Sequence, residues 1–212
     1  LAQVGHPEFE RPYGMSIPAA YALVANRYMH EYNVTSRHLD GVSVAMRKHA
    51  HMTPGAHKRD LITLKDVAES AMISSPLRLL HCSLISDSAA AMVISSKSSG
   101  LCSEKAPVAI IGSGQGHTHQ HIISAPSLTK FGCHQSARAA FAEARIKPNN
   151  IDFVEIYDSF SITLLIELES MGFFAPGEAG SAILEGALDI TGFLPCNTHG
   201  GLLSHGHSGA AG

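Results

Sequence analysis

The sequence lacks a basic excess, a long apolar run and an N-terminal signal pattern. Its 15 basic and 18 acidic residues give a formal net charge of −3 and a pI of about 6.5. A nucleic-acid-binding domain normally carries a basic face, so we exclude that class. No stretch approaches the ~18 uninterrupted apolar residues of a membrane-spanning helix, so we expect no membrane span. No basic segment followed by an apolar one opens the given sequence, so we see no secretion signal in it. Because the sequence begins at Leu1 and not at Met, a preceding segment could carry one.

Cysteines and charged residues are also scarce. Four cysteines stand far apart with no C-x-x-C pair, so neither a zinc ribbon nor a small disulfide-bonded scaffold fits. The sequence therefore predicts a reducing, cytoplasmic location. Only 16% of the residues are charged and 45% are hydrophobic, which excludes intrinsic disorder. A chain of 212 residues can form one ordinary domain, or one domain with an appendage.

The N-terminal part of the chain shows the periodicity and the end signals of short helices. Apolar residues recur at helical spacing over residues 18–32, and Asn33 ends this pattern. A second helix is predicted over residues 36–53. A third, shorter helix begins at Thr63, which with Asp66 forms the pattern of a capping box. Short helices of this kind predict a helical excursion that packs on a larger body.

The rest of the chain alternates between strand and helix patterns. Apolar, small-residue runs predict buried strands over residues 86–94, 108–111 and 151–156. Helical periodicity predicts helices over residues 135–145 and 160–171. A strand–helix–strand–helix order is typical of α/β folds, in which helices cover a sheet and crossovers connect the strands. We therefore predict an α/β fold with a mixed sheet and covering helices.

Two motifs combine residue types that are suited to catalysis. Residues 157–160 (YDSF) lie where a predicted strand ends and a helix begins, and strand ends of α/β sheets are common ligand sites. The second motif includes Gly200, Gly201 and His207. Glycines allow a close backbone approach to a ligand, and a loop histidine can move a proton or stabilise an oxyanion.

Three other patterns suggest chemistry that their details do not support. Residues 112–116 (GSGQG) follow a predicted strand, but their glycine spacing is not that of a dinucleotide site. The alternating residues His117, His119 and His121 share one face of an extended segment, yet no further ligand is specified, so we expect structural histidines and no metal site. Residues 206–208 resemble part of a nucleophile elbow, but Ala210 occupies the fifth position, where the elbow requires glycine, which leaves serine hydrolysis as a weak alternative.

Taken together, the motifs resemble those of the thiolase superfamily. Residues 197–207 are similar to its N-x-x-G-G…G-H loop, residues 154–160 occupy the place of its N-E-A-F or H-D-x-F motif, and residues 86–91 are similar to its S/N-D-G-A-A-A strand. The sequence resembles most the sterol-carrier-protein-x, or lipid-transfer, type of thiolase. Tyr157 stands where steroid side-chain aldolases of this type also carry a tyrosine. The resemblance implies a layered αβαβα fold.

The sequence also departs from the family pattern. Ser88 replaces a glycine of the strand motif, and Ser208 replaces the proline after the motif histidine. Neither of the two family cysteines is found, because none of the four cysteines occupies a family position. These are Cys82, Cys102, Cys133 and Cys196.

From the resemblance we expect an incomplete thiolase-like chain, that is, an internal fragment of a longer protein of this family. Residues 1–80 would be part of the loop domain, and residues 81–98 the last strand region of the N-terminal half. Residues 105–212 would be a truncated C-terminal thiolase-like domain. The polar stretch over residues 95–105 is the expected boundary.

The resemblance further implies roles for individual residues. His207 would donate a hydrogen bond to the thioester oxygen, and Tyr157 would exchange a proton with the substrate. The remaining expected contacts are with the substrate or the coenzyme A (CoA) moiety. They involve Asn197, Gly200, Gly201, Gly206 and Ser83.

The implied activity is carbon–carbon bond formation or cleavage beside a CoA thioester. The first hypothesis is retro-aldol cleavage of a β-hydroxyacyl-CoA with a lipid or steroid acyl group. Thiolytic acyl transfer and a non-catalytic, acyl-CoA-binding or partner-binding subunit are the alternatives. The expected partners are acyl-CoA, a second copy in a homodimer and a small protein with an OB fold and a zinc ribbon. No covalently bound cofactor is expected, because the CoA thioester is the substrate.

Overall fold

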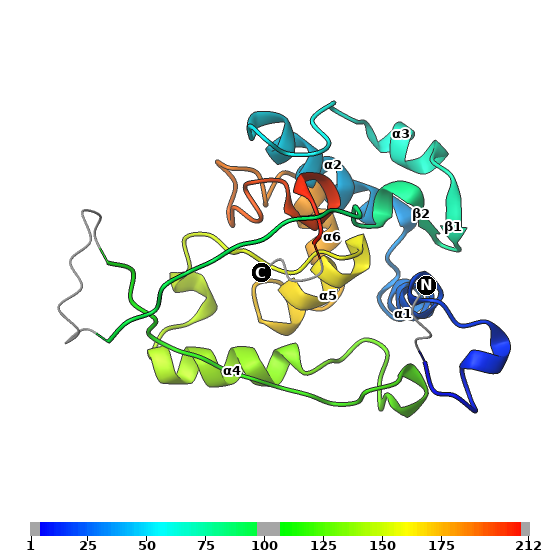
Figure 1. Ribbon diagram of the computed structural model, residues 1–212, viewed down its shortest axis with the longest axis horizontal. Helices are drawn as coiled ribbons and strands as arrows, with labels where there is room; N and C mark the ends of the chain where they lie inside the picture. Colours follow the sequence, from blue (N-terminus) through cyan, green and yellow to red (C-terminus); the bar gives the residue numbers. More distant parts are fainter. Residues whose placement is uncertain (1–4, 97–106, 209–212) are drawn as a thin grey trace.

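The structure is a computed structural model that describes residues 5–96 and 107–208 (Figure 1). Helix α1 spans Ile17–Tyr32; the Ser16 hydroxyl accepts a hydrogen bond from the Ala19 N–H, and Asn33 ends the helix in the left-handed conformation at φ 55°. These ends confirm the predicted first helix. Local signals suffice here because capping involves only residues within one turn.

The other two predicted N-terminal helices are also confirmed. Helix α2 spans Ser36–Met52, and helix α3 spans Leu64–Glu69. The predicted capping box is present: the Thr63 N–H donates to Asp66 Oδ2 at 2.7 Å, and the Asp66 N–H donates back to Thr63 Oγ1 at 3.2 Å. Strands β1 (Met72–Ser74) and β2 (Leu77–Arg78) follow as an antiparallel hairpin that the sequence pattern did not indicate.

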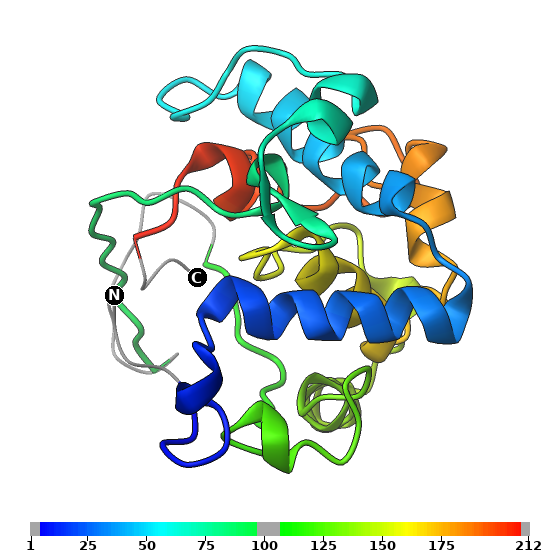
Figure 2. The ribbon, with the colours of Figure 1, turned by 90° about the vertical axis from the view of Figure 1, so that its right-hand side faces the viewer.

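The core is centred on helix α5 (Ser161–Ser170), whose apolar side chains are nearly all buried. It contacts α1, α2, α4 (Cys133–Ala144) and α6 (Ala179–Leu184). Figure 2 shows α1 crossing the molecule with α2 above it, and α5 contacts both helices. The C-terminal part ends in a short π-helix, η5 (Gly201–His205), which packs on α2. Single 3-10 turns are η1 (Arg11–Tyr13), η2 (Leu79–His81), η3 (Ile122–Ser124) and η4 (Pro148–Asn150).

The predicted strands are wrong within the described residues. Residues 86–94 and 108–111 form no strand, although the Ser86 N–H donates to the His207 carbonyl, and their apolar side chains are exposed, with Val93 at 89% and Val108 at 96%. Residues 151–156 make only one bridge, from Val154 to Cys196. A strand is stable only when a neighbour accepts and donates its backbone hydrogen bonds. Within the described residues the only sheet is the two-stranded one of β1 and β2, which agrees with the predicted incomplete α/β fold. The predicted linker over residues 95–105 lies almost wholly outside the described residues.

The three glycines of residues 112–116 let an extended segment pack directly on helix α4. A Cβ atom at Gly114 would overlap the Ser136 carbonyl oxygen, and one at Gly112 would overlap the Ala140 carbonyl oxygen. Glycine is therefore required at these positions for contact between two backbones. This packing explains a pattern that superficially resembles a dinucleotide-binding loop.

Candidate active site

The two predicted motifs meet at their functional side chains. The Tyr157 hydroxyl lies 2.9 Å from His207 Nε2, within hydrogen-bond distance. The two rings are 5.6 Å apart between centroids and inclined by 71°. Tyr157 is 44% exposed, so a ligand can reach this pair from solvent. The predicted proximity is confirmed, while the catalytic roles of both residues stay predictions.

Asp158 joins the two motifs through the backbone of η5. Its buried carboxylate accepts hydrogen bonds from the Leu202 N–H at 2.6 Å and the Leu203 N–H at 3.3 Å. Gly201 makes room for this contact, because a Cβ there would overlap the Asp158 carboxylate and its φ is +60°. Burial raises the pKa of Asp158 to about 6, although the backbone hydrogen bonds act in the opposite direction. Asp158 lies inside the first motif, but its residue type and position in the sequence did not indicate this role.

Asn197 supports the main chain immediately before Tyr157. Its Oδ1 accepts from the Ile156 N–H and its Nδ2 donates to the Ile156 carbonyl, each at 2.7 Å. Asn197 is 1% exposed, so its amide group is used for hydrogen bonds within the protein. Gly200 similarly approaches helix α2, where a Cβ would come within 2.6 Å of Ala50 Cβ. Both positions thus have structural tasks, and their predicted contacts with CoA stay predictions.

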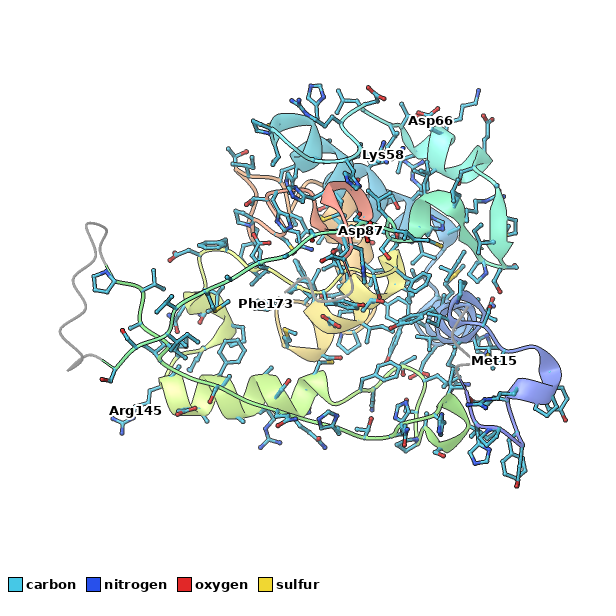
Figure 3. The ribbon with its side chains drawn as sticks, in the orientation of Figure 1. Met15, Lys58, Asp66, Asp87, Arg145 and Phe173 are labelled. Atoms are coloured by element: carbon cyan, nitrogen blue, oxygen red, sulfur yellow. The ribbon has the colours of Figure 1, made fainter. Side chains whose placement is uncertain are left out.

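Residues 82–86 run alongside both motifs. The Ser83 N–H donates to the Ser159 carbonyl at 2.9 Å, and the Leu84 N–H donates to the Leu202 carbonyl at 3.2 Å. In Figure 3 the labelled Asp87 marks where this segment passes η5. Ser83 therefore lies beside the motif that contains Tyr157, although its predicted contact with CoA is untested.

The histidines of the segment 117–121 point to different neighbours. His117 Nε2 lies 2.9 Å from the Gln115 amide, the His119 ring contacts Phe131, and His121 Nδ1 lies 4.0 Å from the Glu10 carboxylate. Across residues 5–96 and 107–208, no three or more histidine, cysteine, aspartate or glutamate side chains are grouped as metal ligands. His117 thus contacts its own segment, whereas His119 and His121 contact other parts of the chain.

The described cysteines are poorly suited to nucleophilic chemistry. Burial raises the pKa of the Cys82 thiol to about 11, and it also raises the pKa of Cys133 and, well above the ordinary value, that of Cys196. A thiol must ionise to attack a carbonyl, so burial keeps these groups in the unreactive form. Cys102 lies outside the described residues.

A cavity of about 410 Å³ between α1, α5 and the segment around His119 contains one carboxyl group, that of Glu167. Burial raises the pKa of Glu167 to about 8, and the nearby Asp158 charge adds to this shift. The side chain is therefore largely protonated at neutral pH. The cavity is otherwise lined mainly by apolar and aromatic groups.

The raised pKa values of Asp158 and Glu167 predict that folding stability falls as pH rises. Carboxyl groups ordinarily titrate near ~4, so the unfolded chain loses these protons first. Their stabilising contribution is complete below pH ~4 and is lost as pH rises through about 6 for Asp158 and about 8 for Glu167. Thermal melts of Glu167→Gln should show a flatter decline than wild type above pH 6.5. Parallel wild-type and variant curves would contradict the assignment to Glu167.

Comparisons with known proteins agree with the motifs. Residues 114–212 match the family described as thiolase C-terminal domain-like. An acetyl-CoA acetyltransferase of Methanothermobacter thermautotrophicus is 36% identical over 98% of this chain and 54% of its own length. A 17-hydroxy-3-oxo-4-pregnene-20-carboxyl-CoA lyase of Mycobacterium tuberculosis is 36% identical over 96% of this chain and 55% of its own length.

A solved structure shows the same fold. The Ltp2-ChsH2(DUF35) aldolase superposes with a TM-score of 0.84 at 34% identity, covering 94% of this chain and 54% of that one. The fold is thus thiolase-like, as predicted. The chain is similar to the thiolase superfamily, with residues 114–212 matching the thiolase C-terminal domain-like family, and it spans about half the length of the curated relatives it matches. Among the described helices, none is long and apolar enough to cross a membrane.

Proposed function

We propose that this chain forms part of an enzyme that cleaves a β-hydroxyacyl-CoA by a retro-aldol reaction, with a lipid or steroid acyl group. The observation that carries the proposal is the 2.9 Å contact between the Tyr157 hydroxyl and His207 Nε2. This pair supplies two groups able to move protons at one accessible place. The names of the M. tuberculosis lyase and of the structurally similar aldolase support this reaction class.

Tyr157 and His207 can carry out the reaction and return to their starting protonation states. Tyr157 accepts the proton of the β-hydroxyl while its own proton passes to His207 Nε2. The Cα–Cβ bond breaks, its electron pair moves toward the thioester carbonyl, and the β-carbon leaves as a ketone or aldehyde. The protonated His207 stabilises the enolate and returns its proton to Cα, giving the shortened acyl-CoA. Tyr157 and His207 are then both restored.

Thiolytic acyl transfer is the second candidate because one relative is an acetyl-CoA acetyltransferase. That reaction needs a reactive thiolate, and burial raises the pKa of each described cysteine. The retro-aldol route needs no covalent cysteine intermediate. Tyr157, at the position where steroid side-chain aldolases of the resembled type also carry a tyrosine, favours the retro-aldol route.

The expected partners of the chain and its domain assignments are part of the same proposal. The name of the structurally similar aldolase, Ltp2-ChsH2(DUF35), couples it with a DUF35 component. We propose a partner of that kind, the expected small protein with an OB fold and a zinc ribbon, beside a second copy of the chain in a homodimer. Residues 1–80, 81–98 and 105–212 keep the proposed assignments to the loop domain, the N-terminal half and the C-terminal domain. A cytoplasmic location belongs to the proposal as well.

Product analysis distinguishes these activities. The complete gene product, with any co-purifying partner, is incubated with a β-hydroxyacyl-CoA that bears a tertiary β-hydroxyl, and the products are followed by mass spectrometry. We expect a ketone and a shortened acyl-CoA without added free CoA. Cleavage of a β-ketoacyl-CoA that depends on free CoA would instead indicate thiolysis. Tight acyl-CoA binding without turnover of either substrate would indicate a binding subunit.

A further inference from the structure

Ser86 holds the main chain of His207 at two points. The Ser86 N–H donates to the His207 carbonyl at 3.0 Å, and the His207 N–H donates to Ser86 Oγ at 3.0 Å. The two residues are 121 positions apart in sequence, so this contact exists only in the folded chain. It fixes the Cα of His207, from which the imidazole reaches Tyr157.

His57 in turn contacts the Ser86 hydroxyl. Its Nδ1 lies 3.1 Å from Ser86 Oγ. Because that oxygen already accepts the His207 N–H, its own proton is available to an unprotonated Nδ1. The backbone of the same loop is attached to η5: the His57 N–H donates to the His205 carbonyl and the Lys58 N–H to the Ser204 carbonyl, each at 3.0 Å.

Gly206 leaves the space in which this arrangement fits. A Cβ at Gly206 would lie 3.0 Å from Ser86 Oγ and 3.9 Å from His57 Nδ1. A side chain there would press on the hydroxyl that holds His207. The glycine before the motif histidine therefore serves the contact with Ser86, which is a task that the motif alone does not reveal.

We propose that Ser86 is a positioning residue for His207 and that His57 orients the Ser86 hydroxyl. The inference rests on the proposed function, because it concerns the same Tyr157–His207 pair. Proton transfer across 2.9 Å depends steeply on geometry, and a shift of about 1 Å in a catalytic group can cost ~10²-fold in rate. Ser86 bonds to the main chain of His207, so it acts on the Tyr157–His207 pair through that main chain.

The kinetic test compares Ser86→Ala with two matched variants in the complete gene product. For Ser86→Ala we expect kcat to fall about 10- to 100-fold, with KM within about twofold of wild type. Ser86→Thr keeps the hydroxyl and should recover most of the lost rate. Ser88→Ala, at an exposed position two residues along, should behave as wild type. His57→Ala should lower kcat by a smaller factor, about 2- to 5-fold.

A spectroscopic readout separates this inference from the proposed reaction. In protein labelled with ¹⁵N-histidine, we expect Ser86→Ala to move the Nε2 signal of His207, because its hydrogen bond to Tyr157 is weakened, while Ser88→Ala leaves it in place. An unchanged Nε2 signal together with an unchanged kcat in Ser86→Ala would overturn the inference. If the signal moves but Tyr157→Phe keeps full turnover, the positioning holds and the retro-aldol mechanism fails.

Discussion

Replacing Tyr157 by phenylalanine should reduce kcat for retro-aldol cleavage by about 10²- to 10⁴-fold, the usual contribution of a positioned acid–base group. The substitution removes only the hydroxyl that lies 2.9 Å from His207 Nε2. The ring stays, and because Tyr157 is 44% exposed, little folding stability depends on it. The measurement is single-turnover kinetics of product formation, accompanied by a thermal melt.

Tyr13→Phe is the matched control for this prediction. Tyr13 is 85% exposed and belongs to the short turn η1, remote in sequence from both motifs. It should keep the wild-type rate. A Tyr157→Phe rate equal to that of Tyr13→Phe would show that the Tyr157 phenol only packs, and the proposed mechanism would have to be abandoned.

Asn197→Ala should cost about 2–5 kcal/mol of folding stability, through two lost hydrogen bonds and the buried groups they leave unpaired. The Asn197 amide satisfies both the N–H and the carbonyl of Ile156 at 2.7 Å, in a place that excludes water. Alanine leaves both groups unpaired. It also fits poorly at φ 47°, a left-handed conformation that asparagine tolerates. The Tm should fall by about 4–20 °C for a protein of this size.

Thermal melts of two further variants test the cause of that loss. Asn149→Ala, at an exposed position in η4, should change Tm by little. Asn197→Asp keeps one acceptor but removes the donor to the Ile156 carbonyl, so its Tm should also fall. A Tm for Asn197→Ala within about 1–2 °C of wild type would mean that the amide is not structural.

The helices were predictable because their signals are local. Ser16 and Asn33 bound α1, and Thr63 with Asp66 starts α3, through contacts that span at most one turn. The strands were not predictable in the same way. The apolar run at residues 86–94 has strand composition, but its pairing depends on a neighbour distant in sequence. The described chain pairs Ser86 with His207 but forms no strand along this run.

The residues of the candidate site were also only partly predictable from the sequence. The motifs identified Tyr157 and His207, because glycines and polar residues at strand ends mark ligand sites in this family. They did not identify Ser86 or His57 as neighbours of His207, nor Asp158 as the group that holds η5. Backbone N–H groups donate to almost any nearby acceptor, so residue identities alone do not reveal these contacts.

By itself, the sequence determined helices α1–α5 but not α6, the resemblance to thiolases and the two residues proposed for catalysis. Each of these depends on residue type and spacing within a short stretch of chain. Only the tertiary structure decided that Tyr157 and His207 face each other at 2.9 Å, that Ser86 holds His207, and that the glycines at 200, 201 and 206 make room for protein atoms. The physical reason is that these contacts join segments far apart in sequence, whose relative placement is set by packing around α5.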